Sequence, residues 1–179
     1  DCLARMVDNK VEAMIKAKEY GFDYWDGDRR YGYGGYKYMP GRWAKAAEQL
    51  IEIYKLKAGS RVLDVGCGKG FLLYDFTKIL PGIEIYGIDV SNYALENSKE
   101  EIKDKLIYGN ATLLPYEDNY FDFVFSLNTF HNLECYDLFD ALKEIERVGK
   151  NNKYICVEAY RNEVEKMNLL YWQVTCEAF

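Results

Sequence analysis

A short apolar segment that runs straight into three closely spaced glycines constrains this chain more than any other feature. Residues 62–70 read Val-Leu-Asp-Val-Gly-Cys-Gly-Lys-Gly, and a helical pattern follows over Lys69–Leu80. Glycines in such a turn adopt positive φ and let the backbone approach a ligand closely. The helix that follows presents N–H groups without intrahelical partners. The segment therefore predicts a buried strand, a tight ligand-binding turn and a helix in succession.

Strand-like and helical patterns alternate through the rest of the chain. Strands joined by helices in this way indicate βαβ units, in which a parallel sheet carries helices on both faces. We therefore expect an α/β fold with a doubly wound, Rossmann-like parallel sheet. The expected strands are Arg61–Gly66, Glu84–Val90, Lys105–Tyr108, Asp122–Leu127 and Tyr154–Ala159. The expected helices are Lys69–Leu80, Asn92–Lys103, Tyr136–Val148 and Glu163–Glu177.

The first third of the chain has a different texture. Tyr24–Trp43 contains five Tyr, two Trp and five Gly and follows neither a helical nor a strand period. Helical patterns flank it at Asp8–Tyr20 and Ala44–Leu56. We interpret residues 1–56 as an N-terminal helical and Tyr/Gly-rich lid segment and residues 57–179 as the core domain. Glycines would act as hinges and tyrosines as walls; the alternative is an extension that packs over the sheet.

Composition excludes several classes of function. The 179 residues have a net charge of −6, and residues 61–179 carry 12 basic and 20 acidic side chains. Nucleic acid is a disfavoured partner, because neutralising phosphates needs Lys and Arg. Five cysteines without a C-x-x-C pair and one histidine argue against a disulfide framework and against a metal site. With no long apolar run and a charged N-terminal stretch, we expect a cytoplasmic protein without a membrane span or signal peptide.

The residues of the glycine turn indicate which ligand it binds. A dinucleotide site needs G-x-G-x-x-G, and the third glycine position is Phe71. A carboxylate at Asp64, just before the turn, would repel a pyrophosphate. It would attract a cation, and S-adenosylmethionine carries a sulfonium and an ammonium but no phosphate. No G-x-x-x-x-G-K-[ST] phosphate loop is present.

Further polar residues follow the later strands. Asp89 ends the second expected strand, 23 residues after Gly66, where a doubly wound fold holds ribose hydroxyls. The amide of Asn110 follows the third strand and could accept from an adenine amino group. The fourth strand ends in Asn128, where the cofactor would meet its substrate. These residues predict one nucleoside-binding edge of the sheet.

The combination of motifs resembles a known family. Asp64-x-Gly-x-Gly-x-Gly, a strand ending in Asp89, Gly109-Asn110-Ala111, Leu114-Pro115 and Phe121-Asp122-Phe123-Val124 are similar to class I S-adenosylmethionine-dependent methyltransferases. Within them the chain is most similar to the ubiquinone/menaquinone-biosynthesis-type small-molecule branch, over roughly Leu56 to Tyr160. The resemblance implies a sheet of strand order 3-2-1-4-5 and S-adenosylmethionine as cofactor. The cofactor-binding residues that it implies are Asp64, Gly66, Cys67, Gly68, Asp89, Val90, Asn110, Ala111 and Asn128.

Two departures from the family pattern stand out. Asn110 replaces the commoner Asp at the adenine position, so that contact should be weaker or differently oriented. The family sheet normally ends in an antiparallel hairpin after the fifth strand. We expect that hairpin to be missing, because the chain stops at Phe179 in or just after a helix, as a fragment of a longer polypeptide would.

The resemblance implies transfer of a methyl group to an O or N nucleophile of a small molecule by in-line displacement. His131, the one histidine, is the candidate general base; the alternative is a packed or solvent-facing loop residue. The candidate substrate and lid residues are Tyr24, Arg29, Arg30, Tyr31, Tyr33, Tyr36, Arg42, Trp43 and Glu158.

Two other functions stay open at this point. The enzyme could methylate a protein or nucleic acid, or the chain could be a non-catalytic S-adenosylmethionine-binding module. A cavity beside the sulfonium, large enough for a nucleophile, would favour the small-molecule enzyme. We expect an apolar block at Leu169–Trp172 in the last expected helix to pack within the chain; the alternatives are a homodimer contact or a substrate wall.

Overall fold

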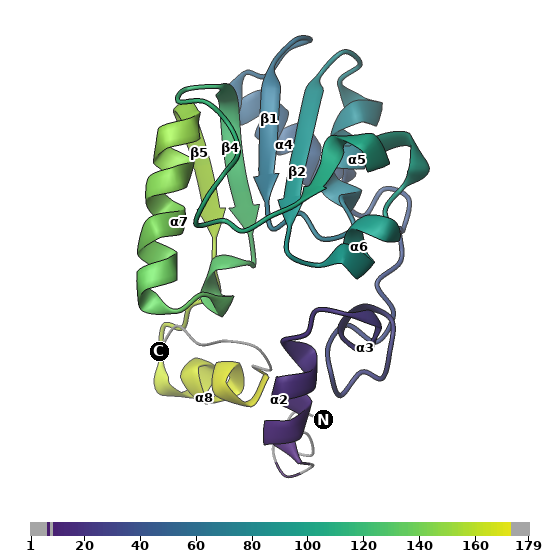
Figure 1. The fold of residues 1–179 in the computed structure, drawn as a ribbon, viewed down its shortest axis with the longest axis vertical. Coiled ribbons are helices and arrows are strands. Elements are labelled where there is room, and N and C mark those ends of the chain that lie inside the picture. The colour runs from purple at the N-terminus through teal and green to yellow at the C-terminus, as the bar shows by residue number, and fades with distance from the viewer. Residues whose placement is uncertain (1–6, 8, 173–179) are drawn as a thin grey trace.

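A five-stranded parallel sheet forms the centre of the computed structural model, which describes residues 7 and 9–172 (Figure 1). Its strand order is β3-β2-β1-β4-β5, and every pairing is parallel. The doubly wound sheet and its strand order are therefore confirmed. The strands are β1 (Arg61–Val65), β2 (Glu84–Asp89), β3 (Leu106–Tyr108), β4 (Phe121–Leu127) and β5 (Gly149–Cys156).

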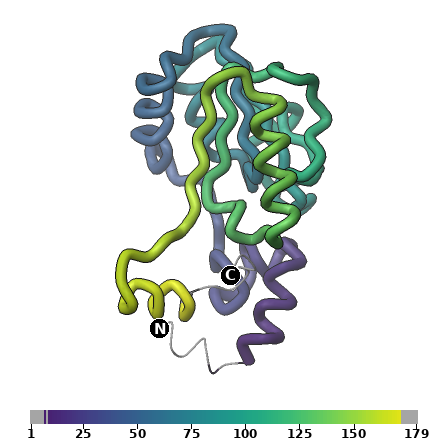
Figure 2. Tube along the Cα trace, turned by 90° about the vertical axis from the view of Figure 1, so that its left-hand side faces the viewer, coloured from purple at the N-terminus to yellow at the C-terminus, as the bar shows by residue number. Residues whose placement is uncertain are grey.

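Helices cover both faces of this sheet, as Figure 2 shows from the side. One face carries α4 and α5, and the other carries α7. Figure 1 shows the N-terminal helices and α8 beyond the carboxyl ends of the strands. The helices are α2 (Lys10–Ala17), α3 (Phe22–Trp25), α4 (Ala44–Tyr54), α5 (Phe71–Ile79), α6 (Asn92–Glu96), η1 (Glu100–Lys105), η2 (Phe130–Asn132), α7 (Cys135–Val148) and α8 (Glu163–Trp172).

Side chains alternate in direction along the two central strands, β1 and β4, so the hydrophobic core is divided between the two faces of the sheet. Val62 of β1 packs with Phe123 and Phe125 of β4 beneath α4 and α5. Leu63 and Val124, which point the other way, pack beneath α7. Both strands are buried on both faces, which explains why they read as nearly continuous apolar runs. The central strands thereby hold their carboxyl ends in fixed positions.

The expected single helix over Asn92–Lys103 is wrong. The chain forms α6, breaks, and continues as the 3₁₀ helix η1. At the break the amide of Asn97 donates to the carbonyl of Tyr93, and the hydroxyl of Ser98 donates to the carbonyl of Leu95. These side chains satisfy carbonyls that the next helical turn would use.

Other boundaries also differ from expectation, two of them for clear reasons. β5 begins at Gly149 rather than Tyr154, because an edge strand pairs on one side only and accepts the polar Lys-Asn-Asn-Lys stretch. Helix α5 begins at Phe71, since Lys69 and Gly70 belong to the turn. The last part of the expected helix Glu163–Glu177, after residue 172, lies outside the described residues.

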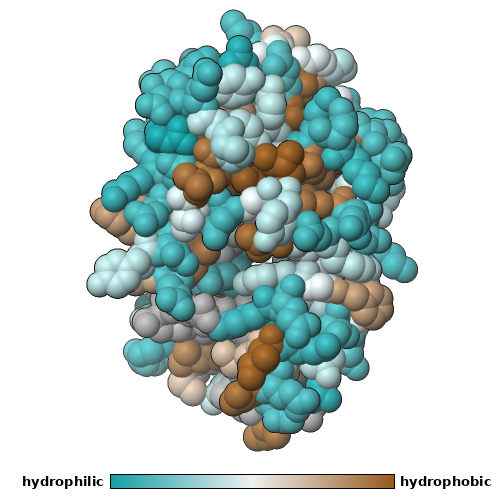
Figure 3. Space-filling view, viewed as in Figure 1, coloured by the Kyte–Doolittle hydropathy of each residue, from teal (hydrophilic) through white to brown (hydrophobic). Residues whose placement is uncertain are grey.

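The surface of the described residues is mixed. Figure 3 shows hydrophilic side chains over most of one face and apolar ones in a band across its middle. On α2, Val11 and Ile15 are exposed, and the amine of Lys10 donates to the carbonyl of Leu170 of α8. None of the described helices is both long enough and apolar enough to cross a membrane.

The Phe123 ring lies at the centre of the α4/α5 side of the core. It stacks on Tyr54 at 4.3 Å and on Phe125 at 5.4 Å between ring centroids, and it is fully buried. We expect Phe123→Ala to lower the free energy of unfolding by about 3–5 kcal/mol, through lost burial and a cavity. Phe139→Ala, on the exposed side of α7, should stay within about 0.5 kcal/mol of the parent. Urea denaturation of both variants checks this, and equal stabilities would contradict the packing.

Candidate active site

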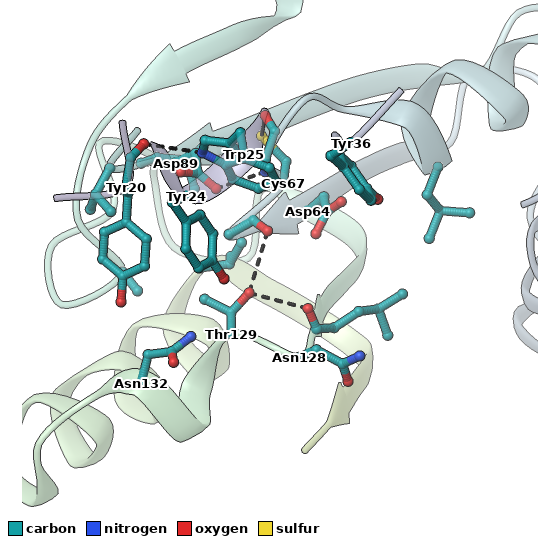
Figure 4. A pocket seen from close by; sticks show the side chains of 18 of the residues that line it. Tyr20, Tyr24, Trp25, Tyr36, Asp64, Cys67, Asp89, Asn128, Thr129 and Asn132 are labelled. Carbon is teal, nitrogen blue, oxygen red and sulfur yellow. Dashed lines mark hydrogen bonds between the residues drawn. The ribbon is translucent and has the colours of Figure 1, made fainter. Parts of the chain in front are cut away.

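A cavity of about 480 Å³ lies at the carboxyl ends of β1, β2 and β4. It is closed on one side by residues 20–43, which we call the cap. Its volume falls in the range of about 300–1,000 Å³ that small-molecule sites occupy. Figure 4 shows Asp64 and Asp89 from the sheet together with Tyr20 and Tyr24 from the cap. The cavity therefore occupies the crevice at which doubly wound folds bind their ligands.

The glycine turn brings the backbone directly to the cavity. Gly66 and Gly68 have φ values of 82° and 54° and line the cavity. A Cβ on Gly68 would lie 2.6 Å from the indole of Trp25, and one on Gly66 would collide with Thr129. Cys67 between them has its thiol pKa raised by burial and by the charges of nearby carboxylates, so it stays a protonated packing residue.

Asp89 is held rigidly at the end of β2. Its two carboxylate oxygens accept one backbone N–H each, from Gly68 at 2.7 Å and from Ser91 at 2.8 Å. Burial raises the pKa of Asp89, and these hydrogen bonds oppose that rise. The carboxylate thus joins the glycine turn to the end of β2. It retains lone pairs for hydroxyl donors in the cavity.

Asp64 is the most unusual group in the site. The residue is 5% exposed, and the described part of the chain offers its carboxylate neither a hydrogen bond nor an ion pair. Burial, reinforced by the charge of Asp89, raises its pKa well above the ordinary value. A buried carboxylate without a partner is unfavourable unless a cation or donor reaches it. The site is therefore preorganised for a positively charged ligand.

The end of β4 contributes a strained residue. Asn128 has a φ of 53°, in the left-handed region, and its backbone N–H donates to the carbonyl of Cys156 at 2.8 Å. The hydroxyl of Thr129 lies 3.3 Å from the carbonyl of Gly66 and 3.2 Å from that of Leu127 (Figure 4). Asn128 thus lines the cavity and Thr129 lies against Gly66, and non-glycine residues with such a φ cluster at functional sites.

The ends of β2 and β3 form the other side of the cavity. Val90 is 45% exposed, and Gly109, Asn110 and Ala111 follow β3. The Asn110 side-chain oxygen accepts the backbone N–H of Thr112 at 3.1 Å. An apolar side chain and a small backbone surface thus stand next to Asp89, an arrangement suited to a flat base attached to a ribose.

Trp25 anchors the cap on the sheet. Its indole N–H lies 2.9 Å from the hydroxyl of Ser91 and 3.1 Å from the carbonyl of Tyr20. Its ring stacks on Tyr33, with centroids 5.2 Å apart and planes 10° apart. Tyr36 in turn stacks on Phe71 at the start of α5. The rings therefore form a continuous wall above the glycine turn.

A buried ion pair holds the cap to the glycine turn. The Lys69 amine contacts the Asp26 carboxylate at 2.6 Å and donates to the carbonyl of Tyr36 at 2.8 Å. The hydroxyl of Tyr93 donates to the same carboxylate at 2.8 Å. Burial alone would raise the pKa of Asp26, but these hydrogen bonds hold it below the ordinary value. We call this group the latch.

Two cap phenols inside the cavity are held in their neutral form. Burial raises the pKa of Tyr24, whose hydroxyl donates to Tyr33. Burial also raises the pKa of Tyr33, and the charges of Glu158 and Asp89 add to the rise. At neutral pH these hydroxyls are therefore hydrogen-bond donors rather than bases.

Some of the site residues predicted from the sequence line the cavity, and others lie outside its wall. All nine predicted cofactor residues line the cavity, as do Tyr24, Tyr33, Tyr36, Arg42 and Trp43 of the predicted lid set. Predicted residues that do not line it are Arg29, Arg30, Tyr31, His131 and Glu158. His131 and Glu158 instead form an ion pair beside the cavity.

The arginines lie away from the wall because the cap turns back on itself there. The Arg29 guanidinium donates to the carbonyl of Gly32, within the same turn. Arg30 lies over the ring of Tyr31, with 5.3 Å from its guanidinium carbon to the ring centroid. Arg29, Arg30 and Tyr31 therefore do not line this cavity, and their contact with a substrate stays a prediction.

Several wall residues were missed from the sequence. Tyr20 precedes the Tyr/Gly-rich segment, and Thr129 and Asn132 follow β4 in a short loop. Trp25 lies within the predicted lid but was not singled out. The signal that could have found Thr129 and Asn132 is their place after the fourth strand, at the same edge as Asp64 and Asp89.

The fold and the site together define a class of protein. A doubly wound sheet with a glycine turn after β1 and an acid at the end of β2 binds nucleoside cofactors. The second, unneutralised carboxylate at Asp64 restricts that class to proteins whose nucleoside ligand is a cation.

Comparison with known proteins agrees with this class. Residues 63–157 match the family model described as a methyltransferase domain, and the chain therefore belongs to that family. It is a class I methyltransferase by fold, and the cofactor of that class is S-adenosylmethionine. The buried carboxylate of Asp64, which has no partner among the described residues, fits such a cationic cofactor.

The curated relatives of this chain include methyltransferases of one name. The chain is 36% identical over 128 residues to a demethylmenaquinone methyltransferase of Bacillus mycoides, covering 65% of this chain and 50% of that one. It is 34% identical over 141 residues to the enzyme of the same name from Staphylococcus aureus, covering 74% and 58%. The chain thus spans about half the length of these relatives.

A solved structure shares the fold. The S-adenosylmethionine-dependent methyltransferase of Aquifex aeolicus superimposes with a TM-score of 0.54 at 25% identity, covering 75% of this chain and 81% of that one. The predicted family resemblance is confirmed.

The latch can be tested through cap stability. We expect Asp26→Asn to lower the free energy of unfolding by about 3 kcal/mol and to speed amide hydrogen exchange in the cap, because it leaves the buried Lys69 charge unpaired. Asp28→Asn, two residues away and exposed, is the matched control. Because the folded pKa of Asp26 is lowered, the pair stabilises the fold fully above about pH 4 and less as the pH falls through that pKa. Unchanged exchange in the cap would contradict the latch.

Proposed function

We propose that this chain transfers a methyl group from S-adenosylmethionine to a small molecule held in the cavity beneath the cap. The single observation that carries the proposal is the buried, unneutralised Asp64 beside Asp89, at the ligand edge of a methyltransferase fold. A pyrophosphate would be repelled by the same pair of carboxylates. A sulfonium and an ammonium would be attracted by it.

The cofactor has a natural orientation in this site. Asp89 would hold the ribose hydroxyls, with Val90 and Ala111 beside the adenine ring and Asn110 at its edge. Asp64 and the turn Gly66–Gly68 would hold the methionine part. When bound, S-adenosylmethionine supplies an activated methyl group on a sulfonium that leaves as a neutral thioether.

The protein's own contribution is to orient the two reactants and to exclude water. The latch keeps the aromatic wall closed over the glycine turn, which removes solvent from the reacting atoms. Asn128 and Thr129 would fix the methionine end against the acceptor. The basic side chains of the cavity wall are Lys18 and Arg42. These two groups offer little positive charge to a nucleic-acid backbone, so nucleic acid is a poor acceptor.

A ring-shaped acceptor matches the wall best. The relatives named demethylmenaquinone methyltransferase suggest a quinone-type ring, and flat rings pack favourably on Tyr24, Tyr33 and Tyr36. The cap covers the cavity, which favours a small molecule over a protein side chain. The proposed assay follows transfer of labelled methyl from S-adenosylmethionine to a dihydroxynaphthalene with a short prenyl chain. Absence of cofactor binding would refute the proposal.

Two substitutions test the cofactor orientation. We expect Asp89→Ala and Asp64→Asn each to weaken S-adenosylmethionine binding by about 1.5–3 kcal/mol, the usual cost of losing a hydrogen bond to a charged group. Asp64→Asn should also raise the stability of the ligand-free protein, since it removes a buried group whose ionised form is unfavourable there. Asp104→Asn, exposed on η1, is the control. Calorimetric titration measures the affinities, and parental affinity in both variants would contradict the orientation.

A further inference from the structure

Arg42 is a charged residue of the cavity wall that has no carboxylate partner in the described part of the chain. Its guanidinium has several N–H donors, and the hydrogen-bond contact that it makes there is to the uncharged thioether of Met39, at 3.5 Å. None of the described aspartates or glutamates forms an ion pair with it. A wall cation without a protein counter-ion is available to an anionic group of a ligand.

A tight turn sets the backbone of Arg42 at the edge of the cavity. The backbone N–H of Arg42 donates to the carbonyl of Met39 at 3.1 Å, and Gly41 has a φ of 79°. Pro40 and Gly41 thus occupy the two central positions of the turn, where a type II turn favours proline and requires a positive φ, respectively. Helix α4 begins two residues later, at Ala44. Local geometry therefore fixes where the Arg42 side chain starts.

The hydroxyl of Tyr36 is a second donor near Arg42. The charge of Arg42 acts on this phenol, and the indole of Trp43 donates to the phenol oxygen. Burial raises the pKa of Tyr36 to about 12, so the hydroxyl keeps its proton at neutral pH. None of the described residues accepts that proton in a hydrogen bond, so it is available to a ligand. Stacking on Phe71, with ring centroids 5.2 Å apart, holds the Tyr36 ring in place.

Both donors belong to the Asp64 end of the cavity. The charge of Asp64 acts on the Tyr36 phenol, and Figure 4 shows these two side chains pointing toward one another. The charge of Asp89 acts on the phenols of Tyr24 and Tyr33. The cavity therefore has a nucleoside end at Asp89 and a second end where a carboxylate, a guanidinium and a phenol come together.

Opposite charges at this second end match an α-amino acid. The methionine part of S-adenosylmethionine carries an ammonium and a carboxylate on the same carbon atom. Asp64 attracts the ammonium, but Asp64 and Asp89 repel the carboxylate unless a cation stands beside it. A guanidinium and a phenolic O–H both donate charge-assisted hydrogen bonds to a carboxylate.

We propose that Arg42 and Tyr36 bind the carboxylate of the methionine part of the cofactor, while Asp64 attracts its ammonium. This inference rests on the proposed function and deepens it. It makes the cap a part of the cofactor site and makes the site selective for a complete amino-acid end. Decarboxylated S-adenosylmethionine isolates the contact, because it keeps the sulfonium and the ammonium and lacks only the carboxylate.

Calorimetric titration with these two ligands tests the assignment. The parent protein should bind S-adenosylmethionine about 10-fold or more tightly than the decarboxylated ligand, the size of one hydrogen bond to a charged group. Arg42→Gln should weaken S-adenosylmethionine binding about 10-fold and change the affinity for the decarboxylated ligand by less than about twofold. Tyr36→Phe keeps the stacked ring and should lower the preference about threefold, through loss of one donor.

Two further variants complete the comparison. Asp64→Asn should weaken both ligands alike and leave the preference intact, since both ligands keep the ammonium and the sulfonium. Lys45→Gln removes a positive charge three residues beyond Arg42, at an exposed position of α4 outside the cavity wall. It is the matched control and should keep the parental preference.

The outcomes separate this inference from the proposed function. If S-adenosylmethionine does not bind the parent protein, the proposed function fails. If it binds, but Arg42→Gln keeps the parental preference between the two ligands, the assignment of Arg42 alone fails. Equal weakening of both ligands in Arg42→Gln would show a structural role and overturn the proposal. A raised Michaelis constant for the acceptor at unchanged cofactor affinity would also overturn it.

Discussion

A buried carboxylate without a protein partner is the constraint around which this structure is organised. Asp64 lies one residue before the end of β1, the central strand of the sheet, close to Asp89, and both line the cavity beneath the aromatic wall of the cap. Such a charge destabilises the ligand-free fold, since water is removed and no cation replaces it. A cationic cofactor beside Asp64 compensates this unfavourable burial. The same carboxylate that destabilises the ligand-free fold therefore makes the site selective for a cation.

The cap and the sheet contribute different parts of the cavity. The sheet places carboxylates and glycines at fixed positions, because β1 and β4 are buried on both faces. The cap closes the cavity through Trp25 and through the latch of Asp26 and Lys69. Because Lys69 belongs to the glycine turn, this ion pair joins the cap directly to that turn.

The sheet and its cavity edge were predictable from sequence, because buried strands and glycine turns leave local patterns. The break after α6 was not, since Asn97 and Ser98 compete for backbone carbonyls only in three dimensions. The start of β5 was missed because an edge strand tolerates polar residues. Which cap residues line the cavity depends on how the Tyr/Gly-rich segment folds back on itself, and no sequence period encodes that fold. For this reason the sequence did not show that Arg29 lies outside the cavity wall. The cytoplasmic location and the homodimer stay predictions.

Proton release on cofactor binding tests the central claim most directly. Burial raises the pKa of Asp64 and so favours its protonated form in the ligand-free protein, whereas a sulfonium or ammonium beside it should favour the ionised form and displace the proton. Calorimetric titration of S-adenosylmethionine near pH 6, in two buffers of different ionisation enthalpy, measures the number released. The account predicts net proton release that Asp64→Asn reduces. Tight binding with no proton release in the parent protein would contradict it.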